Sequence, residues 1–183
     1  MRSARILTVA LTLLSCGAVA GEATVSTAAS QPAQAWTETK WPFLIDQWGL
    51  GRSFECKAAA CGSDLTLYLR AKVGFCNCTT GIVEDDEIDR VGDVSLIGRQ
   101  TSAQRFGVPV AIGWMKGRSR SFMVAALDRS QRYVLTVAVS NKCDAVVATV
   151  VADRVLSPDA ERAALDFLGS EPVLQWASST TGL

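Results

Sequence analysis

The sequence predicts a single α+β domain, mostly antiparallel β-sheet, with a C-terminal amphipathic helix packed on one face. Three observations lead to this prediction. Residues 65–72 alternate between apolar and polar side chains, as a half-buried strand does. Residues 108–151 contain further strand-like runs joined by short turns, which favour antiparallel pairing. After Ser157, apolar residues recur at helical spacing.

The N-terminal residues 1–20 have the pattern of an export signal. Arg2 and Arg5 give a basic start, and residues 6–14 form an apolar run that is shorter than the roughly 20 residues a membrane-spanning helix needs. The small residues at 18–20 then match a signal peptidase site. We therefore expect cleavage after Ala20 and a periplasmic or secreted protein.

Lipid attachment at Cys16 is the alternative, although Leu14 is bulky where such sites carry a small residue. Residues 21–35 are small and polar without periodicity, which indicates a flexible linker. The domain is then expected to span residues 36–183. No second apolar run reaches membrane-spanning length, so the mature chain is expected to be soluble, with no transmembrane segment.

The first part of the domain is rich in aromatic residues. Residues 36–51 contain three of the tryptophans, and Pro42, Gly49 and Gly51 favour irregular packed structure there. The strand at 65–72 follows. The acidic residues that crowd the start of segment 84–93 indicate a short helix or an acidic turn.

The second half is expected to be sheet. Strands are predicted from the alternation of apolar residues, at 108–114, 122–126, 133–139 and 143–151. Turns are predicted between them, at 116–119, 128–132 and 141–142. The last strand is apolar on both faces, so it is expected to be central or covered by a helix.

That covering helix is predicted after Ser157, the N-cap, with Pro158 in its first turn. One apolar face is expected to consist of Ala160, Ala163, Ala164, Phe167 and Leu168. Gly169 is expected to end the helix, and Pro172 to start a last short turn.

Composition argues against most catalytic classes. The chain contains no histidine, which removes Ser-His-Asp and Cys-His catalysis and the usual general base at neutral pH. No nucleophile motif or phosphate-binding glycine loop is present. With zero net charge, nothing suggests nucleic acid binding. A non-catalytic protein without a cofactor is therefore expected.

In an oxidising compartment, cysteines are expected to form disulfides. The predicted candidates are Cys56, Cys61, Cys76 and Cys78, forming two bridges that tie the loop after residue 52 to the loop after residue 72. A direct bond between Cys76 and Cys78 would close a very tight ring. Cys143 is expected to be the odd thiol.

The alternative hypothesis is a thiol–disulfide or metal-handling protein that uses the Cys76/Cys78 pair. A strained disulfide between them would be easily exchanged. Their spacing differs from the common zinc ribbons, so no metal site is predicted.

Charge is segregated along the chain, with acids in residues 84–93 and bases in residues 99–132. The simplest interpretation is two solvated surfaces that could face each other. The acidic run could also bind Ca²⁺, but it lacks the spacing of an EF-hand loop. Lys116, Arg118 and Arg120 could instead grip an anion, because guanidinium groups suit carboxylates and phosphates.

The cluster of Trp36, Trp41, Phe43 and Trp48 could line a ligand groove, although such residues more often close an open core. Together with the three cations above, Trp41 and Trp48 form the predicted contact surface. The leading hypothesis is an exported, non-catalytic binding domain of a bacterial-type envelope, stabilised by disulfides. Its expected partner is an unknown protein or a small anionic ligand in the envelope.

Overall fold

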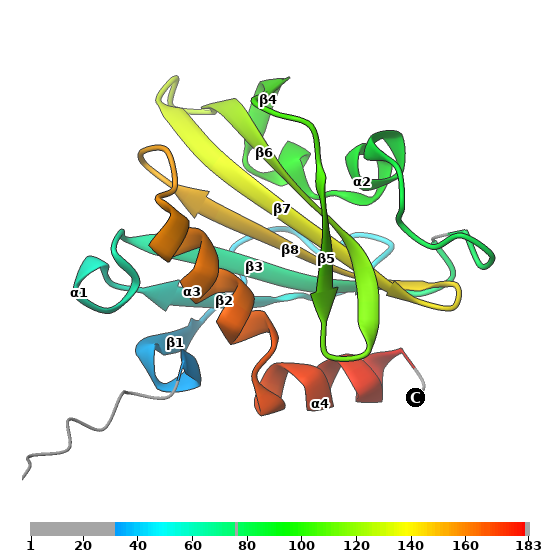
Figure 1. Ribbon diagram of the computed structural model, residues 1–183. Helices are drawn as coiled ribbons and strands as arrows, with labels where there is room; N and C mark the ends of the chain where they lie inside the picture. Colours follow the sequence, from blue (N-terminus) through cyan, green and yellow to red (C-terminus); the bar gives the residue numbers. More distant parts are fainter. Residues whose placement is uncertain (1–31, 76, 182–183) are drawn as a thin grey trace, which may run out of the picture.

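In a computed structural model, residues 32–75 and 77–181 are described, and they form one curved antiparallel sheet with short helices around it (Figure 1). The strands run in the order β1-β2-β3-β8-β7-β6-β4, and β5 also pairs with β6. The predicted α+β domain, dominated by antiparallel sheet and ending in helix, is confirmed. The leader, Cys16 and the linker up to residue 31 lie outside the described residues.

The strands have the following bounds: β1 Trp36–Thr39, β2 Arg52–Cys56, β3 Leu65–Lys72, β4 Gly98–Ala103, β5 Val108–Ile112, β6 Met115–Ala126, β7 Gln131–Asn141 and β8 Asp144–Ala152. The helical elements are η1 Pro32–Ala35, α1 Ala58–Cys61, α2 Asp85–Val91, η2 Val94–Leu96, α3 Pro158–Leu168 and α4 Glu171–Thr180. Within the described part of the chain, no helix is long and apolar enough to cross a membrane.

The larger hydrophobic core lies between one side of the sheet and α3 and α4. Leu67 and Leu69 of β3 belong to it, since successive strand residues point to opposite faces. Phe167 of α3 stacks on Trp36 at 4.8 Å between ring centroids and contacts Phe54 edge to face at 4.9 Å. The α3 N-cap is as predicted, because Ser157 Oγ accepts a hydrogen bond from the Ala160 N–H.

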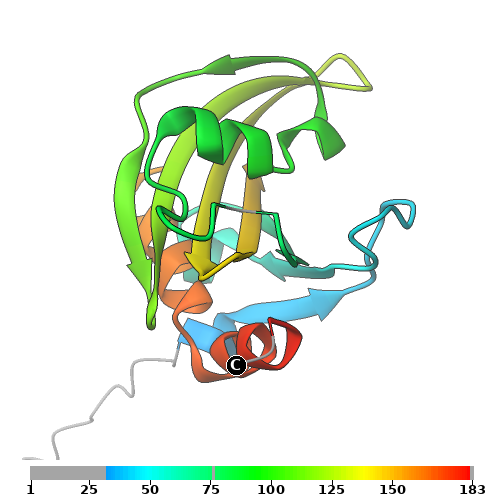
Figure 2. The ribbon, with the colours of Figure 1, turned by 90° about the vertical axis from the view of Figure 1, so that its right-hand side faces the viewer.

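The opposite side of the sheet carries a smaller core. Ile82 and the buried face of α2, Ile88 and Val91, pack there against the small side chains of β7 and β8. A reciprocal capping box between Glu84 and Glu87 starts α2, and further acids in its first turn suit the positive end of the helix dipole. Figure 2 shows α3 and the loop between β1 and β2 on opposite sides of the sheet.

One predicted turn is wrong. The chain reverses at Gly113 and Trp114, where Ile112 pairs with Met115, and the predicted turn at 116–119 lies inside the continuous strand β6. Gly113 has φ +58°, which a glycine tolerates. A Cβ on Gly117 would overlap the Ala138 carbonyl, so that glycine permits close strand approach rather than a turn.

Three smaller differences concern the chain termini and a short helix. Trp36 begins a strand, whereas irregular structure was expected there. The region after Pro172 forms the ten-residue helix α4, longer than the predicted short turn. The helix α1 was not predicted. The turns predicted at 128–132 and 141–142 are present with shifted bounds, at 127–130 between β6 and β7 and at 142–143 between β7 and β8.

The disulfide pairing also differs from the prediction. Cys56, the last residue of β2, bonds to Cys61, the last residue of α1, and Cys78 bonds to Cys143, so the expectation of an unpaired Cys143 is wrong. The β7–β8 turn brings the Cys143 Cα within 4.1 Å of that of Cys78. Cys76, the remaining candidate, lies outside the described residues. Two disulfides fit an oxidising, extracytoplasmic environment.

We expect the two disulfides to contribute unequally to stability. Cys78–Cys143 joins residues 65 apart and Cys56–Cys61 residues 5 apart, and longer loops lose more entropy in the unfolded chain. Replacing both cysteines by serine should lower the free energy of unfolding by about 4 kcal/mol for the long loop and about 2 kcal/mol for the short one. Urea unfolding of the two double variants measures this. Equal losses would contradict the loop-entropy argument.

Candidate binding site

A buried charge cluster lies on the side of the sheet that carries α2. Arg70 of β3, with a side chain only 3% exposed, donates from Nε and Nη2 to the Asp93 carboxylate at 3.0 and 2.6 Å. Its Nη1 donates to Asp46 at 2.7 Å. Lys72 Nζ lies 2.8 Å from Asp93 and donates to the Val91 carbonyl at 2.7 Å. Each buried cation therefore has a carboxylate partner.

Trp41 and Trp48, two of the predicted ligand contacts, cover this cluster. The Arg70 guanidinium lies 5.7 Å from the Trp41 ring centroid, and Lys72 Nζ lies 5.6 Å from that of Trp48. Trp41 is buried, and Trp48 contacts Phe75 edge to face. Because two cations face two carboxylates, the cluster is neutral. It attaches the 41–50 loop and the end of α2 to the sheet.

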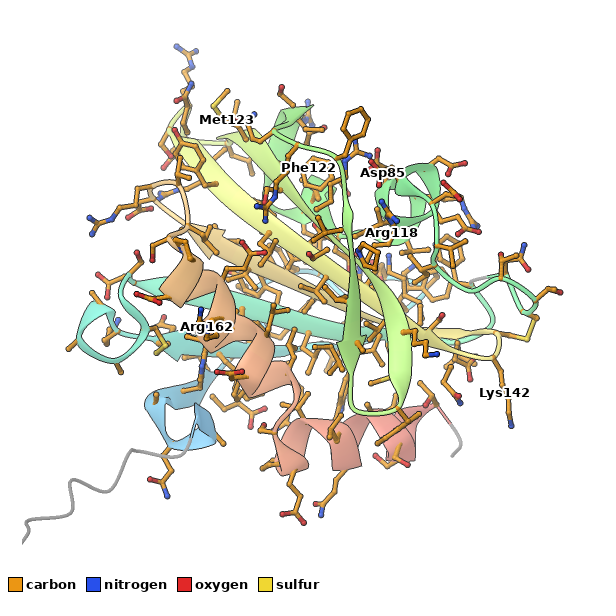
Figure 3. The ribbon with its side chains drawn as sticks, in the orientation of Figure 1. Asp85, Arg118, Phe122, Met123, Lys142 and Arg162 are labelled. Atoms are coloured by element: carbon orange, nitrogen blue, oxygen red, sulfur yellow. A yellow bond between two sulfur atoms is a disulfide. The ribbon has the colours of Figure 1, made fainter. Side chains whose placement is uncertain are left out.

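The acidic and basic runs meet at α2 and β6. Arg118 binds Asp85 at 2.8–3.0 Å and also donates to the Val83 and Gly107 carbonyls at 2.8 and 2.6 Å. Figure 3 shows Asp85 and Arg118 side by side. Arg120 binds Asp89 at 2.7 Å. Both arginines contact α2 from β6, and their donors already serve internal carboxylates and carbonyls.

The two α2 carboxylates that share Arg120 are shifted in opposite directions. The Gly107 N–H, followed by Arg118 and Arg120, lowers the pKa of Asp85 below its usual range against a partial opposing effect of burial. Burial raises the pKa of Asp89, and Arg120 only partly offsets it. As pH falls, Asp85 therefore keeps its negative charge, and its ion pair with Arg118, to a lower pH than Asp89 keeps its own charge.

The acidic run offers no evident cation site. Asp85, Asp89 and Asp93 are paired with arginine or lysine, and Glu84 and Glu87 form the capping box. Among residues 32–75 and 77–181, no group of three or more cysteine, aspartate or glutamate side chains is arranged to hold a metal ion.

An apolar cavity of about 540 Å³ lies beside Arg118, between segment 80–83 and β5; we call it the β5 pocket. Its walls are mainly aliphatic. They comprise Thr80, Ile82, Val83, Pro109, Val110, Ala111, Lys116, Gly117, Arg118 and Ser140. In the Cys78–Cys143 disulfide, Cys78 lies two residues before Thr80, and Cys143 lies in the β7–β8 turn, three residues after Ser140.

Lys116 gives this pocket its charge. Arg118 is neutralised by Asp85, whereas in the described part of the chain the Lys116 ammonium has no ion-pair partner and is exposed. The other polar side chains at the pocket are the hydroxyls of Thr80 and Ser140. The pocket thus combines an apolar interior with one available cation.

A second cavity, of about 570 Å³, lies at the other end of the same sheet face, beside Phe43 and Tyr68. Its charges are mostly paired with one another. Arg132 bridges Asp128 and Asp153, and Glu55 binds Lys57 at 3.1 Å. The remaining carboxylate of this groove, Asp64, accepts a hydrogen bond from the Ala58 N–H at 3.0 Å. Both cations of this groove, Lys57 and Arg132, are therefore paired, in contrast to Lys116 at the β5 pocket.

Sequence reasoning found Lys116 and Arg118 but missed the pocket walls. A strand was predicted at 108–114, and its residues Pro109, Val110 and Ala111 line the pocket, yet nothing in its pattern shows that segment 80–83 lies opposite. The Cys76/Cys78 redox pair is not supported, because Cys78 bonds to Cys143. Comparisons with protein-family models and with curated proteins found no match to this chain.

We expect Asp93 to be the residue whose charge the fold depends on most. Asp93→Asn leaves Arg70 and Lys72 buried without their shared counter-charge, which should lower the free energy of unfolding by about 3 kcal/mol. Asp46→Asn is the matched control, because Asp46 binds the same arginine from an exposed position and should cost less than about 1 kcal/mol. Urea unfolding at neutral pH compares them. Equal losses from the two variants would contradict this assignment.

Proposed function

We propose that the protein is an exported, non-catalytic binding domain of a bacterial-type envelope, and that its ligand is an anionic amphiphile held in the β5 pocket. Such a ligand has an apolar body and one anionic group. The observation that carries the proposal is the exposed Lys116 ammonium, which has no ion-pair partner among residues 32–75 and 77–181, at a mainly aliphatic cavity. Ligand pockets are typically apolar with a few polar groups that orient the ligand.

Export is supported by the leader-like pattern of residues 1–20 and by the two disulfides. The proposed contact surface keeps Lys116 from the sequence prediction, with Arg118 as a neutralised wall residue. Arg120, Trp41 and Trp48 act in the internal charge contacts instead.

Expression with the leader in a bacterium that has a periplasm tests the export. We expect a periplasmic product that begins at Gly21. Since removal of the leader leaves five cysteines, two disulfides should leave one thiol per chain. Intact mass before and after alkylation measures both quantities. A lipid-modified product beginning at Cys16 would support the alternative anchoring, and an uncleaved cytoplasmic chain would contradict export.

Binding is tested with anilinonaphthalene sulfonate as a fluorescent probe and dodecanoate as its competitor. Lys116→Ala should weaken binding of both anions about tenfold, because a charged hydrogen bond is lost. Ala111→Phe should abolish binding by filling the cavity. Dodecanol, which has no charge, should compete equally well with wild type and with Lys116→Ala.

Lys40→Ala serves as the matched control, because Lys40 is an exposed lysine outside the pocket residues. It should bind both anions as the wild type does. No saturable binding to the wild type, or equal weakening by the two lysine variants, would refute the assignment of the ligand site to the β5 pocket.

A further inference from the structure

The two disulfides differ in their exposure to solvent. Cys56 and Cys61 are 1% and 3% exposed and belong to the larger core. Cys78 is exposed, and Cys143 is half-buried at the β7–β8 turn. Because thiol–disulfide exchange requires access of the attacking thiolate to a sulfur atom, only the second bond can be reached without unfolding.

The exposed disulfide also holds one wall of the β5 pocket. Segment 77–81 is a turn closed by the hydrogen bond from the Gly81 N–H to the Asn77 carbonyl at 2.7 Å. A Cβ on Gly81 would lie 2.5 Å from Ser140 Oγ, so this turn rests directly on β7.

The rest of that wall is attached differently. Val83 is held by a hydrogen bond from its N–H to Glu87 at 2.8 Å and by Arg118, which donates to its carbonyl. Ile82 is buried in the smaller core. Thr80 also donates from Oγ1 to Glu87 at 3.5 Å, which holds it towards α2, whereas the Cys78–Cys143 bond is the covalent link that holds segment 78–81 against the end of β7. Opening the bond would therefore release the side of the pocket next to Ser140 and leave the Val83 side in place.

We infer that Cys78–Cys143 is a thiol-exchange site that controls ligand binding in the β5 pocket. An external dithiol supplies the reductant. One of its thiolates attacks Cys78 Sγ, forming a mixed disulfide and releasing the Cys143 thiolate, which takes up a proton. The second dithiol sulfur then displaces Cys78, so that the reductant leaves as a cyclic disulfide and the protein holds two thiols.

The difference in exposure favours this direction of attack. Cys78 is exposed whereas Cys143 is half-buried, so Cys78 offers the more accessible sulfur to an attacking thiolate. The control of binding rests on the function proposed above, whereas the exchange at Cys78–Cys143 does not.

Limited reduction tests the exchange by itself. The oxidised mature protein is first treated with N-ethylmaleimide to block its free thiol, then titrated with dithiothreitol and trapped with iodoacetamide. Peptide mass mapping should find Cys78 and Cys143 alkylated while Cys56 and Cys61 remain linked. Opening of Cys56–Cys61 first, or of both bonds at the same dithiothreitol concentration, would overturn the inference.

Anilinonaphthalene sulfonate binding to the same singly reduced protein tests whether the Cys78–Cys143 disulfide controls ligand binding. It should weaken about tenfold, because the released wall must be ordered again when the probe binds, and it should recover on reoxidation. Equal binding by the oxidised and reduced forms would overturn the proposed control of binding by the disulfide but leave the proposed function intact. Absence of binding by the oxidised form would instead refute the proposed function, with the exchange still judged by mass mapping.

The double variant Cys78→Ser/Cys143→Ser should reproduce the weak binding of the reduced form, with Cys56→Ser/Cys61→Ser as the matched control that retains binding. Far-UV circular dichroism verifies the sheet in each variant. If the first variant does not fold, the singly reduced wild type provides the test. Full binding by a folded Cys78→Ser/Cys143→Ser protein would contradict the inference.

Discussion

The need to neutralise Arg70 and Lys72 determines how the α2 side of the sheet is covered. Both cations lie on a buried strand, and leaving either without a counter-charge would cost several kcal/mol. Asp93 satisfies both, and because it follows α2 directly it fixes the end of that helix over β3. The start of the helix is fixed over β6 by Asp85 and Arg118. Two ion contacts thus set the position of α2 on this side of the sheet.

The position of α2 determines where the pocket lies. With Asp85 attached to Arg118, the preceding residues Ile82 and Val83 must run beside β6, opposite the hairpin formed by β5. Further back, segment 77–81 has few apolar side chains and no helix, so burial contributes little to its position. The Cys78–Cys143 disulfide holds segment 77–81 in position, as a hydrophobic contact does for Ile82.

Much of the fold could be predicted from local patterns, because strand alternation, turn residues and the Ser157 cap act over a few residues. The errors arose where one residue type serves two purposes. In the sequence Gly117 resembles a turn glycine, yet its role is to permit close approach to Ala138. That role depends on the neighbouring strand, which the local sequence does not reveal. The partner of Cys78 is 65 residues away, so only the tertiary arrangement reveals it. Arg118 and Lys116 look equivalent in the sequence, although one is neutralised and the other is not.

The spacing of helix and strand explains that last difference. Asp85 and Asp89 are separated by about 6 Å along a helix, and Arg118 and Arg120 by about 7 Å along a strand. The two pairs therefore match, Asp85 with Arg118 and Asp89 with Arg120. Lys116 lies one further step along β6, beyond the first residue of α2, and the nearest preceding acid, Glu84, is used in the capping box. Helix α2 therefore offers one carboxylate fewer than this row of β6 has cations. The Lys116 ammonium, which has no ion-pair partner in the described part of the chain, lies at the pocket.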